Sequence, residues 1–79
     1  MATVQLFASY AEMLGARSVE VPLEKETTVK ELVEKLRALP GASRLPESPR
    51  VAINKSFAAT DQLVFAGDEI ALIPPVAGG

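Results

Sequence analysis

The sequence predicts a single two-layer α+β domain, in which one long helix covers a mixed sheet of four or five strands. Apolar and polar residues alternate near both ends of the chain, as they do in strands with one buried face. One segment between them carries a single apolar stripe with helical spacing. The 79 residues leave room for one hydrophobic core, which we place in residues 1–75, followed by a short tail at 76–79.

The start of the chain predicts a strand followed at once by a short helix. Residues 3–8 alternate between the two faces of a sheet. The residues of this strand expected to face inward are Val4, Leu6 and Ala8. Ser9 and Glu12 then have the spacing of a capping box, and Gly15 suits the end of a helix of about two turns.

A second alternating segment follows this helix. Its strand is expected over Ser18–Leu23, with Val19, Val21 and Leu23 facing inward. Pro22 falls on the outward phase and has no amide hydrogen to donate, which places the strand at an edge of the sheet. Because only a short helix separates the two strands, they are expected to be antiparallel neighbours.

The clearest helix is predicted over Val29–Leu39. Its apolar residues recur along one face, at Val29, Leu32, Val33, Leu36 and Leu39. Thr28 and Glu31 form a second capping box, and Glu31 with Lys35 is an i,i+4 pair in the favourable order. The Pro40-Gly41 pair ends the helix, and a loop follows.

The last third of the chain predicts two strands with a less regular stretch between them. The strands are expected over residues 51–53 and 69–73. The residues expected to face inward are Val51 and Ile53 in the first, and Ile70 and Leu72 in the second. Between these strands we expect a short strand near Phe57 and an irregular stretch that buries Leu63.

Composition excludes several classes of function. The chain has no cysteine and no histidine, so thiolate metal sites, cysteine nucleophiles and imidazole acid–base chemistry are absent. A net charge of −2 without a basic stripe argues against nucleic acid as a partner. No apolar run is long enough to cross a bilayer, and the first residues lack the basic start of a signal peptide. A cytoplasmic protein without a membrane partner is therefore expected.

The tail carries the candidate chemistry. Pro74-Pro75 favours an extended backbone, and glycine at Gly78 and Gly79 makes the end thin and conformationally permissive. Such an end suits insertion into another protein's active site. A carboxylate on Gly79 is unreactive until an ATP-dependent partner converts it to an acyl-adenylate. The residues expected to enter partner active sites are Pro75, Val76, Ala77, Gly78 and Gly79.

A second candidate site lies on the outward phase of the predicted central strands. Its apolar residues are Phe7, Ala52, Ala71 and Ile73. If the strands are adjacent, these side chains form an exposed apolar patch on the open face of the sheet, which is typical of an interaction surface. The competing interpretation is scattered surface residues, or a small satellite core under the loop of residues 56–65.

These features together resemble the small, sulfur-carrying subunits of molybdopterin synthase. Residues 67–79, Gly-Asp-Glu-Ile-Ala-Leu-Ile-Pro-Pro-Val-Ala-Gly-Gly, resemble the C-terminus of that family. Leu6-Phe7-Ala8-Ser9 resembles its first strand and short helix, and Val51-Ala52-Ile53-Asn54 its third strand and turn. The chain departs from the family pattern at Ile73, where an aromatic residue is frequent.

The resemblance implies a ubiquitin-like β-grasp fold, with the first and last strands parallel and adjacent. It also implies that an adenylyltransferase related to ubiquitin activators charges Gly79 using ATP, and that a sulfur-donating enzyme converts it to a thiocarboxylate. The large synthase subunit would then take the tail and pass the sulfur to cyclic pyranopterin monophosphate. The catalytic side chains would belong to the large subunit, and no cofactor would be bound permanently.

Three other interpretations remain open from the sequence. One is a sulfur carrier of the thiamine pathway, and another is a protein modifier that forms isopeptide bonds through Gly79. The third is a β-grasp binding module that acts through its surface patch alone. Two terminal glycines can also be a frayed end without function, since termini are often small and poorly ordered.

Overall fold

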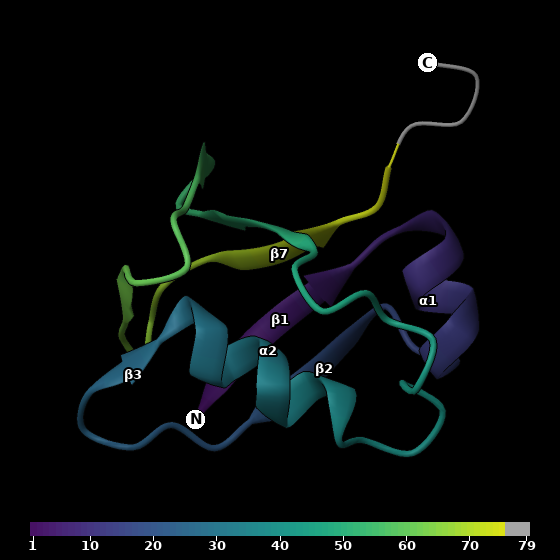
Figure 1. Cartoon of the computed structure of the whole chain (residues 1–79), viewed down its shortest axis with the longest axis horizontal. Coiled ribbons are helices and arrows are strands. Elements are labelled where there is room, and N and C mark those ends of the chain that lie inside the picture. Colours follow the sequence, from purple (N-terminus) through teal and green to yellow (C-terminus); the bar gives the residue numbers. More distant parts are fainter. Residues whose placement is uncertain (76–79) are drawn as a thin grey trace.

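A computed structural model describes residues 1–75 and contains two helices and seven short strands (Figure 1). The strands and helices follow one another in the order β1 (Ala2–Leu6), α1 (Ala8–Leu14), β2 (Ser18–Val21), β3 (Thr27–Thr28), α2 (Val29–Arg37), β4 (Arg50–Ile53), β5 (Ser56–Phe57), β6 (Leu63–Val64) and β7 (Ile70–Ile73). In this part of the chain, no helix is long and apolar enough to cross a membrane.

Five of the strands form one mixed sheet in the order β2-β1-β7-β4-β5. The last strand, β7, runs parallel to the first, with Val4 opposite Ile70 and Leu6 opposite Leu72. Its other neighbour, β4, is antiparallel, and β2 lies at the sheet edge beside β1. The predicted mixed sheet, the edge position of β2 and the parallel pairing of the first and last strands are confirmed.

The helix α2 packs on one face of this sheet (Figure 1). Its buried residues are Val29, Leu32, Val33 and Leu36. They share a core with the inward residues of the strands, which include Val4, Leu6, Val51, Ile53, Ile70 and Leu72. The predicted stripe is thus confirmed, although the helix ends at Arg37, earlier than expected. On the opposite face, which we call the open face, the side chains of Thr3, Gln5 and Phe57 are exposed within residues 1–75.

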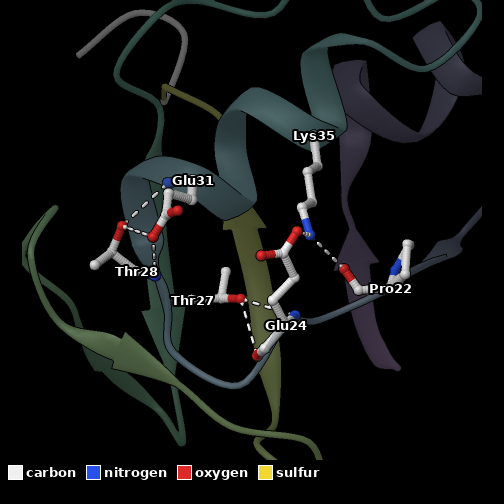
Figure 2. A network of polar contacts seen from close by, with 6 residues as sticks. All are labelled: Pro22, Glu24, Thr27, Thr28, Glu31 and Lys35. Atoms are coloured by element: carbon white, nitrogen blue, oxygen red, sulfur yellow. Dashed lines mark hydrogen bonds and ion pairs between the residues drawn. The ribbon is translucent and has the colours of Figure 1, made fainter.

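The start of α2 is capped by the two residues that the sequence indicates (Figure 2). The Glu31 amide donates to the Thr28 hydroxyl at 3.2 Å, and the Thr28 amide donates to the Glu31 carboxylate at 3.1 Å. The expected pairing of Glu31 with Lys35 is replaced by longer-range contacts. Lys35 donates to the carbonyl of Pro22 at 2.9 Å and lies 4.0 Å from the Glu24 carboxylate. It therefore ties α2 to the chain that follows β2.

The capping box predicted for α1 is wrong. Phe7 is the N-cap residue and accepts from the amide of Tyr10 at 3.0 Å, with no side-chain cap hydrogen bond. The helix begins two residues earlier than expected, at Ala8, whose φ is 47°. Ser9 is therefore already inside the first turn, where its hydroxyl is no longer at the capping position. The predicted end of the helix is confirmed, because Gly15 takes the left-handed conformation with φ 67°.

A second, two-stranded sheet joins β3 to β6 and is absent from the sequence prediction. In this pair Thr27 lies opposite Val64, which is 2% exposed. Leu63, expected to be buried, is instead 41% exposed. A strand alternates its side chains between two faces, so the register that buries Val64 turns Leu63 outward.

The beginning of β7 is held by hydrogen bonds to the turn after β4. The Asn54 amide donates to the Glu69 carbonyl at 2.7 Å, and the Glu69 amide donates to the Asn54 side chain at 2.9 Å. The Asp68 carboxylate accepts from the Asn54 side chain at 3.2 Å and from the Phe65 amide at 2.9 Å. These contacts connect β4 and β7 where β7 starts, which helps to set the direction in which β7 runs.

Candidate functional site

The candidate tail follows the central strand of the sheet. Because β7 lies between β1 and β4, it is paired on both sides as far as Leu72, and with β4 alone at Ile73. Ile73 and Pro74 are half-buried, and Pro75 is exposed. The other tail residues named from the sequence, Val76, Ala77, Gly78 and Gly79, lie outside the described residues. The structure thus shows a firmly held strand up to the point where the tail begins.

Two of the four predicted patch residues meet directly on the open face of the sheet. Ala52 of β4 is the cross-strand partner of Ala71 of β7, and both are half-buried. On the other side of β7, Ala71 lies opposite Gln5. Ile73 is two residues further along β7 and therefore faces the same way as Ala71. Its cross-strand partner is Arg50.

The fourth predicted patch residue, Phe7, lies apart from the alanine pair. It follows β1 and caps α1, and its side chain is 46% exposed. Since β1 and β7 are parallel, Phe7 lies at the end of the sheet where β7 ends. It lines a shallow cavity of about 460 Å³ together with Ala11 and Arg17. The structure therefore places Phe7 beside the start of the tail and away from Ala52.

The same open face also carries Phe57, near which a short strand was predicted, although Phe57 was not among the predicted patch residues. Phe57 of β5 is the cross-strand partner of Ala52 and is 66% exposed. The guanidinium of Arg50 lies over its ring, 5.1 Å from the centroid, within the range of a cation–π contact. The signal for Phe57 was weak because its strand is only two residues long, too short to show an alternation.

A smaller cavity of about 210 Å³ lies where the tail begins. Ile73 and Pro75 line one part of it, and Arg50 from β4 and Tyr10 from α1 line another. Tyr10 is 4% exposed, and its burial raises the pKa of the phenol, so it stays protonated at neutral pH. This cavity brings together α1, the loop before β4 and the end of β7.

The described residues hold no candidate metal centre. Among residues 1–75, no group of three or more aspartate or glutamate side chains is arranged to hold a metal ion. The site there consists of a small apolar patch on the open sheet face and of the strand from which the tail starts. The patch is formed by Ala52, Phe57, Ala71 and Ile73 and is bordered by Gln5 and Arg50. Such an arrangement can bind a protein surface and present a chain end to it.

Known proteins are similar to this chain in both sequence and fold. The chain matches the ThiS family over residues 4–79. It is 36% identical to a molybdopterin synthase sulfur carrier subunit of Dictyostelium discoideum, over 96% of this chain and 93% of that protein. It is 34% identical to small archaeal modifier protein 1 of Haloferax volcanii, over 95% of this chain and 97% of that protein.

Solved structures agree with these matches. The crystal structure of SAMP1 from Haloferax volcanii superposes with a TM-score of 0.84 at 34% identity, covering 99% of this chain and 98% of that one. A chain in the complex of subunits 1 and 2 of molybdopterin-converting factor from Helicobacter pylori has a TM-score of 0.70 at 23% identity, covering 99% and 97%, and shows the fold alone. The fold is therefore the ubiquitin-like β-grasp. By its sequence match and its fold, this chain belongs to the ThiS family.

Proposed function

We propose that this chain is a cytoplasmic sulfur carrier for molybdenum cofactor biosynthesis, whose working group is the carboxylate of Gly79. The proposal is supported by membership of the ThiS family and by the similarity to a molybdopterin synthase sulfur carrier subunit. It is also supported by the composition, because a chain without cysteine or histidine must obtain its reactive sulfur from other proteins.

The observation that carries the proposal is the position of β7. The strand that leads to Gly-Gly is the central one, held by β1 on one side and β4 on the other, and it carries two of the apolar residues of the open face, Ala71 and Ile73. Because the same strand leads into the tail, the start of the tail has a fixed position relative to a partner that docks on this face. Positioning of this kind lowers the entropic cost of bringing a chain end to an active site.

The proposed chemistry has three steps. First, a ubiquitin-activating-like adenylyltransferase joins the Gly79 carboxylate to the α-phosphate of ATP, and pyrophosphate leaves. Second, hydrosulfide released by a sulfur-donating enzyme attacks the activated carbonyl, the bond to AMP breaks, AMP leaves, and a thiocarboxylate results. Third, the sulfur adds to cyclic pyranopterin monophosphate within the large synthase subunit, and hydrolysis of the acyl bond to the carrier restores the Gly79 carboxylate.

The chain's own residues have binding and positioning roles in this scheme. Residues 75–79 enter the active sites of the partners, while Phe7, Ala52, Ala71 and Ile73 contribute to the interface with the large subunit. The catalytic side chains come from the partners, and ATP is consumed by the activating enzyme. The chain itself needs no permanently bound cofactor for this role.

Intact-mass measurement of the untagged protein from its native cells tests the proposal. We expect a population heavier by the difference between one sulfur and one oxygen atom, and we expect it to disappear when Gly79 is deleted. Adding one residue after Gly79 is the matched control, because it keeps both glycines but moves the carboxylate. A mass that stays that of the free carboxylate, even with the activating enzyme, ATP and a sulfur donor present, would contradict sulfur transfer.

A second candidate function is protein modification through the same carboxylate. It is favoured by the 34% identity and the TM-score of 0.84 to SAMP1, a protein named as a modifier. The two functions share the adenylate and then diverge, because a lysine amine attacks in place of sulfur. Mass spectrometry of peptides from native cells separates them. Lysines joined by an isopeptide bond to the C-terminal peptide of this chain would support modification. After trypsin this peptide is residues 56–79, because Lys55 is the last basic residue. Their absence beside a thiocarboxylate would support sulfur transfer alone.

A further inference from the structure

We propose that the small cavity where the tail begins is a socket for an acidic side chain of the adenylating partner, and that Arg50 is its main recognition residue. This inference rests on the proposed function, because it assumes that an adenylating enzyme takes the tail. It deepens that function by naming the chemistry through which this partner recognises the chain beside Pro75.

The lining of the socket is suited to a carboxylate. Its polar side chains are those of Tyr10, Ser48 and Arg50, each of which can donate a hydrogen bond to an anion. Its apolar walls come from Ile73 and Pro75, with two further prolines from the loop before β4. No acidic side chain of residues 1–75 lines this cavity. A volume of about 210 Å³ is enough for one aspartate or glutamate side chain.

The charge of Arg50 is not neutralised within the described part of the chain. Within residues 1–75 the ion pair is that of Lys35 with Glu24, and both residues are distant in sequence from Arg50. The nearest acid in sequence before the strand, Glu47, lines a different cavity with Val29 and Lys30. Arg50 is therefore a cation without an acidic partner among these residues, and it can pair with a carboxylate of another protein. It offers this positive charge on a chain whose net charge is −2.

Phe57 contacts the Arg50 guanidinium from the cavity next to the socket. The Arg50 guanidinium lies over the Phe57 ring at 5.1 Å, and Arg50 lines both the socket and the shallow cavity beside Phe57. A guanidinium can rest one planar face on a ring while the N–H donors at its edge stay available. A cation that is already oriented loses less conformational entropy when it pairs, which strengthens recognition.

The socket acts on binding and leaves the chemical step unchanged. Four residues separate Pro75 from the end of Gly79, and an extended chain of that length spans about 13 Å. In the proposed complex the tail enters the active site extended, and an acidic side chain seated beside Pro75 would then lie well away from the reacting carboxylate. We assign the socket to the adenylating partner because adenylation precedes both sulfur transfer and protein modification.

ATP–pyrophosphate exchange with the purified adenylating enzyme tests the proposal on the full chain. We expect Arg50→Glu to raise KM for the carrier about tenfold, with kcat changed less than about twofold. Arg50→Gln should give an intermediate KM. The matched control is Arg44→Glu, the same charge change on an exposed arginine of the loop after α2, which should leave KM within about twofold. Circular dichroism and thermal melting verify that all variants fold.

The outcomes separate this proposal from the proposed function. If the wild-type chain supports no exchange, the proposed function fails. If the wild-type chain is active and Arg50→Glu keeps the wild-type KM, the socket proposal alone is overturned. A lower KM for Arg50→Glu would mean that Arg50 holds the chain's own terminal carboxylate, which also overturns it. Restored binding of Arg50→Glu when one acidic residue of the partner is changed to arginine would establish the contact.

Discussion

Ala52 of β4 and Ala71 of β7 are direct cross-strand partners on the open face of the sheet. Two small side chains at this place leave the centre of the face flat between Phe57 on one side and Gln5 on the other. A flat apolar surface can pack closely against a partner, and the strand that carries Ala71 continues into the tail. The surface and the C-terminal tail are therefore connected through one strand.

We expect Ala71→Glu to weaken binding of the large synthase subunit by about tenfold or more, because it introduces an uncompensated charge in the centre of the contact. Thr3→Glu is the control, since Thr3 lies on the same face at the far end of β1. Isothermal titration calorimetry with the large subunit measures both. Equal affinities for the two variants would show that the alanine pair is outside the interface.

We expect Thr28→Ala to lower the free energy of unfolding by about 1 kcal/mol, because it removes the hydroxyl that accepts from the Glu31 amide. Ser9→Ala should change it by less than about 0.5 kcal/mol, since Ser9 makes no cap hydrogen bond in α1. Urea denaturation monitored by circular dichroism compares the two. If Ser9→Ala lowered the free energy of unfolding as much as Thr28→Ala does, Ser9 would be a capping residue, contrary to the structure.

The cap of α2 also predicts a dependence of stability on pH. The hydrogen bond from the Thr28 amide, followed by that from the Thr28 hydroxyl, lowers the pKa of Glu31 below its usual 4.5. A lowered pKa in the folded state means stabilisation that is fully present above the unfolded pKa and is lost as the pH falls through the folded one. We therefore expect Glu31 to contribute stability at neutral pH and to lose it below about pH 4.5.

The variant Glu31→Gln measures this contribution. Its free energy of unfolding should fall below that of the wild type at pH 7, and the difference should shrink as the pH is lowered from 5 to 3 (about the range in which glutamate titrates). Glu34→Gln removes one charge from the same helix without touching the cap and serves as the control. A difference for Glu31→Gln that stays constant down to pH 3 would contradict the assignment.

The register of the two-stranded sheet predicts that truncating Val64 costs more stability than truncating its neighbour Leu63. Val64 is 2% exposed and Leu63 is 41% exposed, although leucine is the larger side chain. Val64→Ala should cost about 2 kcal/mol, from two lost methyl groups and the cavity left behind. Leu63→Ala should cost less than about 1 kcal/mol. Chemical denaturation measures the free energy of unfolding of both variants. A larger loss for Leu63→Ala than for Val64→Ala would contradict the register of β6.

Local patterns in the sequence were enough to predict α2 and the central strands. The stripe from Val29 to Leu36 and the capping box at Thr28 depend on contacts within a few residues, and both were predicted correctly from their spacing. The alternation of Ile70 and Leu72 likewise determines which side of β7 faces the core. The resemblance of residues 67–79 then pointed to the fold and to the tail.

The remaining features depend on contacts between distant segments. Ser9 and Glu12 have the same spacing as Thr28 and Glu31, but the way the chain leaves β1 makes Phe7 the cap instead. Burial of Val64 in place of Leu63 follows from pairing with Thr27, which is remote in sequence. The stacking of Arg50 on Phe57 follows from the β4–β5 pairing. Sequence spacing alone determined the local elements, whereas only the tertiary structure decided these contacts, because strand register and burial are set by partners far along the chain.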